Sequence, residues 1–200
     1  MAYRPPTPSG LKAKDLIGLP WRVAFALQAD GWYLRSDIIW HKPNCQPESV
    51  RDRPTRAHEY VFLLSKSATY HYDHEAMREP AVGGSGTATR SRRSVWSINT
   101  KPYPGAHFAT FPLDLVDVCL AAGAPPSATV LDPFCGSGTV GVACRRLGHA
   151  FVGIDLNPEY VALARARIAS ALDPPPSSSS SKSEPSSSSP PGSGSPDVSG

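Results

Sequence analysis

The residues in this chain that could do chemistry are gathered around one glycine-containing loop. The stretch "VLDPFCGSGTVGV" at 130–142 begins like a buried strand and then breaks into Gly136 and Gly138, separated by one serine. Glycine has no Cβ, so the backbone there can come close to a ligand. Asp132 lies just before the glycines, and Asp155 follows 17 residues after Gly138. A carboxylate near that second spacing is suited to bind the hydroxyls of a ribose.

Asp132 discriminates between two kinds of nucleotide ligand. With Gly141, the two glycines satisfy the GxGxxG spacing of dinucleotide-binding folds, which alone is a weak signal. A carboxylate beside the loop would repel a pyrophosphate but could hold an ammonium group. S-adenosyl-L-methionine, an adenosine joined to an amino acid, satisfies both features. Taken singly, these residues could equally serve a tight turn, helix packing or a helix cap, but their ordered combination favours the ligand.

The elements around the loop predict a parallel α/β unit. Residues 128–133 carry a β-branched and apolar run typical of a central parallel strand. Apolar spacing then predicts a helix over 140–147, which Gly148 ends as a C′ residue. A second strand is predicted over 150–155, followed by a helix with Asn157 as its N-cap. The order is therefore strand, glycine loop, helix, strand, acid and helix.

Composition divides the chain into a folded unit and a tail. Residues 173–200 are almost entirely Ser, Pro and Gly, which predicts a disordered tail because too little apolar surface is present to offset the ordering entropy. The folded unit is thus expected over 1–172. Its N-terminal part contains a predicted helix at 19–29, with Val23 and Leu27 on its apolar face, and a strand at 36–41. A second strand is predicted within "HEYVFLLSKS" at 58–67, in which Tyr60 and Phe62 are expected in the core rather than stacked on bases.

Charge and cysteine usage set further limits. The formal net charge of +3 mildly favours a polyanionic partner. The four cysteines show no CxxC pairing, and we find no secretory signal or long apolar span, which favours reduced thiols in a cytoplasmic protein. His41 and Cys45 are four residues apart but lack evident partners, so no metal site is expected.

Three stretches carry a resemblance to a known family: "DIIWHKPNCQPESVRDRPTRAHEYVFLLSK", "SVWSINTKPYPGAHFATFPLDLVDVCL" and "DPFCGSGTVGVACRRLGHAFVGIDLNPEYVALARARI". Together, over roughly residues 11–170, they resemble the bacterial amino-methylating DNA methyltransferases with permuted motif order. The resemblance implies a Rossmann-like α/β fold dependent on S-adenosylmethionine, circularly permuted and incomplete. It also implies a target-recognition region inserted at 44–95 and a cofactor-binding half at 96–170.

The resemblance implies roles for individual residues in binding S-adenosyl-L-methionine. Asp132 would face the amino group of the cofactor, Asp155 would bind its ribose, and the glycine loop would pass beneath it. The segment just upstream would line the methionine end. The full expected set of cofactor contacts is Asp132, Phe134, Gly136, Gly138, Thr139, Asp155, Phe108 and Thr110.

The expected partner is double-stranded DNA. Basic side chains on phosphates would give salt-dependent affinity, and an arginine at a guanine edge could select sequence. Acids share the segment, so a merely solvated surface is the alternative. "GGSGTATRSRR" at 83–93 is predicted to be a flexible basic loop that orders on DNA. The arginines expected to contact DNA are Arg51, Arg53, Arg56, Arg90, Arg92 and Arg93.

One family motif is absent from the sequence. Family members carry Asp, Asn or Ser before two prolines and an aromatic residue, which align the exocyclic nitrogen of a flipped base for attack on the methyl group. No proline pair here is followed by an aromatic residue. We therefore expect an N-terminally shortened DNA methyltransferase that acts on the exocyclic amino group of a base, cytosine N4 rather than adenine N6. A second polypeptide could supply the missing half.

The sequence leaves two other functions open. The first is a non-catalytic fragment that binds the cofactor and DNA. The second is a dinucleotide-dependent oxidoreductase, which Asp132 disfavours.

Overall fold

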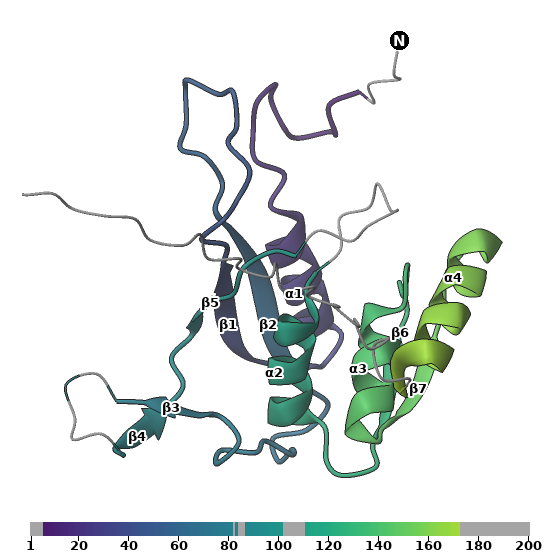
Figure 1. Cartoon of the computed structure of the whole chain (residues 1–200). Coiled ribbons are helices and arrows are strands. Elements are labelled where there is room, and N and C mark those ends of the chain that lie inside the picture. The colour runs from purple at the N-terminus through teal and green to yellow at the C-terminus, as the bar shows by residue number, and fades with distance from the viewer. Residues whose placement is uncertain (1–5, 82, 84–86, 102–110, 173–200) are drawn as a thin grey trace, which may run out of the picture.

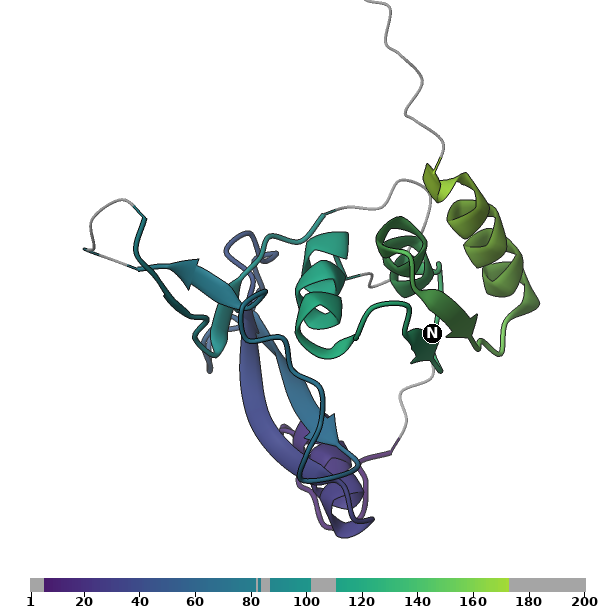
Figure 2. The ribbon, with the colours of Figure 1, turned by 90° about the horizontal axis from the view of Figure 1, so that it is seen from below.

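The computed structural model describes residues 6–81, 83, 87–101 and 111–172. Within these residues the strands form three separate sheets, two of which lie on either side of one helix, α2 (Figures 1 and 2). None of the described helices is long and apolar enough to cross a membrane. The expected tail at 173–200 lies outside the described residues.

The larger sheet has three strands in the order β2-β1-β5. The central strand β1 (Tyr33–His41) pairs antiparallel with β2 (His58–Ser65) and parallel with β5 (Val95–Ser97). Apolar and aromatic side chains dominate β1 and β2, as expected for strands with a buried face. Both strands predicted in this part of the sequence are confirmed. The outer edge of β2 pairs with no other strand in the described part of the chain.

Helix α1 (Leu19–Ala29) covers one face of this sheet, and its predicted bounds are confirmed. Trp21 makes edge-on ring contacts with Tyr60 and Phe62 of β2, at centroid distances of 5.6 and 4.9 Å. These two rings therefore serve packing, as the sequence favoured. Val23, which we expected on the buried face, is exposed. Two residues after Trp21, its side chain is turned about 200° around the helix, away from the sheet.

The smaller sheet contains the predicted parallel unit. Strands β6 (Thr129–Asp132) and β7 (Ala150–Gly153) pair in parallel, and α3 (Thr139–Leu147) connects them. Helix α4 (Pro158–Ala169) follows β7. The predicted caps are confirmed.

Each cap uses the chemistry that the sequence indicated. Gly148 ends α3 in the left-handed region, with φ of 76°. Asn157 accepts a hydrogen bond from the backbone N–H of Glu159 at 2.9 Å, which satisfies one free donor of the first turn of α4.

Helix α2 (Leu113–Gly123) packs against both sheets, and the sequence did not predict it. Two of its side chains, Leu115 and Ala122, join a core cluster with Trp40, Met77 and Trp96 of the larger sheet and its neighbouring segments. Two others join a second cluster, which consists of Val116, Leu120, Ala143 and Cys144. The helix is therefore shared by both cores.

A short hairpin lies beside the larger sheet, at the lower left of Figure 1. Strand β3 (Arg78–Pro80) pairs antiparallel with β4 (Thr89–Ser91). The prediction of a flexible loop over 83–93 was therefore wrong at 89–91. Backbone pairing with β3 fixes those residues, although their sequence carries no apolar alternation that would have indicated a strand.

Candidate functional site

The glycine loop connects β6 to α3, at the carboxyl ends of the parallel strands. Gly136 and Gly138 have φ of 47° and 80°, in the region that side chains disfavour. Gly138 also lies against α4, because a Cβ built there would be 2.8 Å from the Cβ of Ala164. The loop thus needs glycine for its backbone angles and, at Gly138, for helix packing as well.

Asp155 fixes this loop from the end of β7. Its Oδ2 accepts a hydrogen bond from the backbone N–H of Gly136 at 2.9 Å, and its Oδ1 accepts one from Asn157 at 2.8 Å. The sequence had placed Asp155 beside the loop, and the structure brings them together. Because a carboxylate has about four lone-pair positions, hydrogen-bonding capacity remains for a ligand hydroxyl.

Asp132 lies on the same loop with one oxygen uncommitted. Its Oδ1 accepts from the backbone N–H of Phe134 at 3.0 Å, and within the described residues its Oδ2 has no partner. Burial raises the pKa of the Cys135 thiol, and the negative charges of Asp132 and Asp155 raise that pKa further. The electrostatics of the loop therefore favour a cationic group and oppose a pyrophosphate.

Apolar side chains stand exposed around the same strand ends. Phe134 is 86% exposed, Leu156 is 100% exposed, and Ile154 and Leu131 are also exposed. Their segments are adjacent, since the backbone N–H of Ile154 donates to the carbonyl of Asp132. Exposed apolar groups beside a polar loop match what a purine ring with a polar substituent requires.

The remaining predicted cofactor contacts are Thr139, Phe108 and Thr110. The side chain of Thr139 is buried, at 6% exposure of the residue, and its Oγ1 lies 3.5 Å from Nη1 of Arg167. A ligand in front of the loop would therefore meet the backbone N–H of Thr139 rather than its hydroxyl. Phe108 and Thr110 lie outside the described residues.

Arg167 of α4 is a site residue that the sequence did not reveal. Its Nη1 donates to the carbonyl and to the Oγ of Ser137, both at 2.8 Å. The contact spans 30 residues. The sequence gives no signal for this contact, because the helical pattern shows Arg167 only as one of several polar residues of α4.

The six arginines expected to contact DNA fall into two groups. Arg51, Arg53 and Arg56 lie on the segment between β1 and β2, drawn above the sheet in Figure 1 and away from the β3–β4 hairpin. In this group, Arg53 forms an ion pair with Glu48 at 2.6 Å, and Arg56 donates to the carbonyl of His58 at 3.3 Å.

The second group consists of Arg90, which lies on β4 of the hairpin, and Arg92 and Arg93, which follow it. Nε of Arg90 and Nε of Arg93 both lie close to Oε1 of Glu79, at 3.0 and 3.1 Å. Partial burial of Glu79 acts to raise its pKa, but the hydrogen bonds from the two arginines prevail and lower it. Arg92 lines a mostly apolar cavity of about 290 Å³, and its buried Nε has no partner among the described residues.

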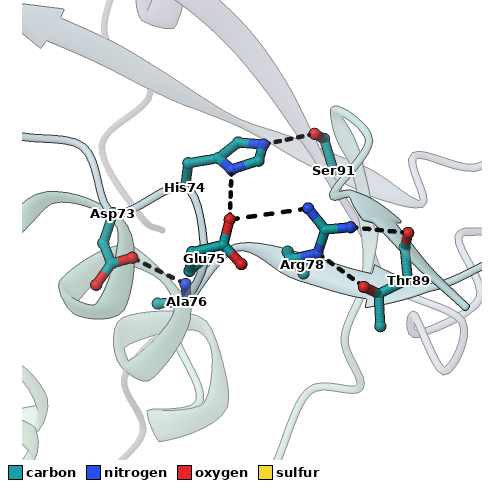
Figure 3. Close-up of polar contacts among 7 residues, drawn as sticks. All are labelled: Asp73, His74, Glu75, Ala76, Arg78, Thr89 and Ser91. Carbon is teal, nitrogen blue, oxygen red and sulfur yellow. Dashed lines mark hydrogen bonds and ion pairs between the residues drawn. The ribbon is translucent and has the colours of Figure 1, made fainter. Parts of the chain in front are cut away.

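Polar contacts anchor the hairpin to the preceding loop (Figure 3). Nε2 of His74 lies 2.9 Å from Oγ of Ser91, and its Nδ1 lies 3.2 Å from Oε1 of Glu75. Nε of Arg78 donates to Oγ1 of Thr89 at 2.7 Å. Serine, histidine and glutamate in series are reminiscent of a hydrolytic triad, but these side chains are exposed and serve here to join two strands to a loop.

The parallel strands, the glycine loop and the acids at the strand ends define a Rossmann-like α/β protein of the methyltransferase type. More specifically, the chain belongs to the DNA methylase family whose model, N6_N4_Mtase, matches residues 6–166.

Relatives of known class match most of this chain. It is 64% identical over 168 residues to the type II methyltransferase M.SmaI of Serratia marcescens, covering 84% of this chain and 57% of that protein. It is 61% identical over 168 residues to M.Cfr9I of Citrobacter freundii, covering 84% and 55%. The chain thus spans little more than half the length of these relatives.

Solved structures share the fold. The M1.HpyAVI–SAM complex is 25% identical, with a TM-score of 0.58 over 77% of this chain and 71% of that one. The cytosine-N4-specific PvuII DNA methyltransferase is 22% identical, with a TM-score of 0.64 over 80% of this chain and 59% of that one. The second likeness supports the fold alone.

Proposed function

We propose that this chain forms the cofactor-binding and DNA-contacting part of an enzyme that methylates the exocyclic amino group of a base in double-stranded DNA. The observation that carries the proposal is the pair of acids on the glycine loop. Asp155 holds the backbone N–H of Gly136, while Asp132 keeps an oxygen available for a cation. The solved relative bound to SAM supports the choice of methyl donor.

The described residues fit S-adenosyl-L-methionine in three respects. Asp132 would pair with its ammonium group, and Asp155 would accept from a ribose hydroxyl. Phe134 and Leu156 would cover the adenine ring, which accounts for two large apolar side chains in solvent. When bound, the cofactor supplies a methyl group activated by a positively charged sulfur.

The two arginine groups would serve the DNA. One group lies on the segment that connects β1 and β2, and the other lies on β4 or directly after it, whereas the cofactor loop follows β6 of the smaller sheet. The base would be flipped from the helix to reach the methyl group. We propose cytosine N4 rather than adenine N6 as acceptor, on the overall likeness of the motifs. Mass analysis of nucleosides from DNA methylated by the whole protein distinguishes the two products.

The residues that surround the acceptor base would come from a further polypeptide segment, which lies along the open edge of β2. Four consecutive residues, Val61 to Leu64, line the cavity beside Arg92. Strand β2 is the last strand of its sheet within the described residues, so the backbone N–H and C=O groups of its outer edge are available to a further strand. We propose that an added strand, in the same or another polypeptide, pairs there.

Co-expression tests the added strand. The probe is the portion of M.SmaI that this chain does not match. Co-purification with slowed amide hydrogen exchange in β2 is expected, and unchanged exchange in β2 would contradict the pairing.

Calorimetric titration with S-adenosyl-L-methionine tests the cofactor site without requiring catalysis. We expect saturable binding that Asp155→Ala weakens at least about a hundredfold, because the variant loses both the loop contact and the ribose acceptor. Glu159→Gln is the matched control, an acid on the exposed side of α4 whose backbone N–H keeps its cap. Absence of binding by the folded wild type, or equal binding by Asp155→Ala, would refute the proposal.

A further inference from the structure

Helix α4 closes the rear of the glycine loop with two side chains one turn apart. Ala164 is buried against Gly138, and Arg167 reaches Ser137. Residues three apart lie on the same face of a helix, so one face of α4 carries both contacts. The small side chain lets the helix approach, and the long one extends to the next residue of the loop.

Arg167 contacts the loop at the residue where the backbone is most free to rotate. Ser137 lies between two glycines of positive φ, where the peptide groups have the greatest freedom to rotate. Arg167 holds the carbonyl of Ser137, while Asp155 holds the N–H of Gly136. Both contacts are charge-assisted, and such hydrogen bonds are roughly twice as strong as neutral ones.

Burial makes the contact specific. Ser137 is 7% exposed, so little water can replace the guanidinium at its carbonyl. The same Nη1 also serves the Ser137 hydroxyl at 2.8 Å. With the loop turned this way, the N–H groups of the first turn of α3 remain at the front, where a helix N-terminus offers unpaired donors.

We infer that Arg167 is a positioning residue that presets the glycine loop for S-adenosyl-L-methionine without touching the ligand. The inference rests on the proposed function and deepens it. Asp155 acts on the loop and the ligand together, whereas Arg167 acts on the ligand only through the orientation of the peptide between Ser137 and Gly138. Substitution of Arg167 should therefore weaken the affinity for S-adenosyl-L-methionine, because the free loop would adopt other orientations that binding has to reverse.

The test compares four substitutions on one helix, of which Arg167→Ala leaves space for free guanidinium to enter. Arg167→Gln removes the charge and most of the reach, and Arg167→Lys keeps the charge but lacks the planar fork. Arg165→Gln is the control, because Arg165 is exposed, lies on the same helix and changes the net charge equally. Each protein is titrated with S-adenosyl-L-methionine, and its thermal unfolding midpoint is measured in parallel.

We expect Kd to rise roughly tenfold or more in Arg167→Gln, as for loss of one charge-assisted hydrogen bond. A smaller rise is expected in Arg167→Lys and none in Arg165→Gln. Millimolar guanidinium should restore part of the affinity of Arg167→Ala, a recovery that a purely structural role would not give. If Arg167→Gln folds poorly, the guanidinium rescue of Arg167→Ala still tests the inference.

The outcomes separate this inference from the proposed function. If the folded wild type does not bind, the proposed function fails. If the wild type binds and Arg167→Gln binds with the same Kd, the inference alone is overturned. An equal loss in Arg165→Gln, or no guanidinium rescue of Arg167→Ala, would also overturn it.

Discussion

The glycine loop and the arginine groups hold their polar atoms in opposite ways. In the loop, Asp155 and Arg167 fix backbone atoms that are already turned toward one conformation. Around the hairpin, Glu79 forms ion pairs with both Arg90 and Arg93. The first arrangement is set before any ligand arrives, whereas the second has to exchange its own ion pairs for those of a partner. Affinity in the second region should therefore depend more strongly on salt.

The largest expected effect comes from breaking the loop at its tightest point. Gly138→Ala adds a Cβ 2.8 Å from that of Ala164, at a φ of 80°. Gly148→Ala meets the same left-handed backbone, at φ of 76°, with no atom within 4 Å. We expect Gly148→Ala to cost about 1–2 kcal/mol and Gly138→Ala about 1–3 kcal/mol more.

Urea unfolding of the two glycine variants measures this difference, which isolates the helix contact from the backbone strain. Equal destabilisation by both substitutions would mean that α4 shifts to accommodate the added Cβ. The loop would then be less rigidly preset than the contrast with the basic region requires.

A smaller effect is expected from releasing the hairpin arginines. Glu79→Gln removes the acid shared by Arg90 and Arg93, so both become available to phosphates. Nonspecific duplex affinity should rise about three- to tenfold. The slope of log K against log salt should steepen by about one to two, because each phosphate contact contributes roughly 0.9.

Asp37→Asn controls for net charge. Asp37 is exposed on β1 and makes no ion pair within the described residues, so its substitution releases no arginine. Fluorescence anisotropy at several salt concentrations gives both slopes. An identical change in the two variants would show that overall charge, rather than the freed arginines, governs binding.

The smallest effect is a pH dependence of stability. The folded-state pKa of Glu79 is lowered from its ordinary value of 4.5, because the arginine hydrogen bonds outweigh partial burial. Its contribution to stability is therefore full above the ordinary value and lost as pH falls through the lowered one. The difference in unfolding free energy between wild type and Glu79→Gln should be constant above the ordinary pKa of 4.5 and shrink as the pH falls below it. A difference that grows on acidification would contradict the pairing.

Local signals in the sequence predicted the parallel unit well. Gly148 and Asn157 cap their helices by chemistry confined to a few residues, so their identity was sufficient. Asp155 follows from the length of one strand–helix–strand unit, which brings the two strand ends together. The spacing therefore carried spatial information.

Contacts between distant segments could not be predicted in this way. Arg167 meets Ser137 across 30 residues, and nothing near either residue indicates the pairing. The sequence identifies Glu79 only as one acid among several, yet its position opposite Arg90 in the hairpin makes it the shared partner of two arginines. Charge composition describes the segment, but register decides which charges remain available.

The shared helix α2 has a consequence for how the protein unfolds. Leu115 and Ala122 complete one core, and Val116 and Leu120 complete the other. If α2 melts, both sheets lose apolar contacts at once, so neither has an independent route to local opening through this helix. The two halves are thereby joined into one cooperative unit, and the amide protons of α2 should exchange with solvent only when the entire fold opens.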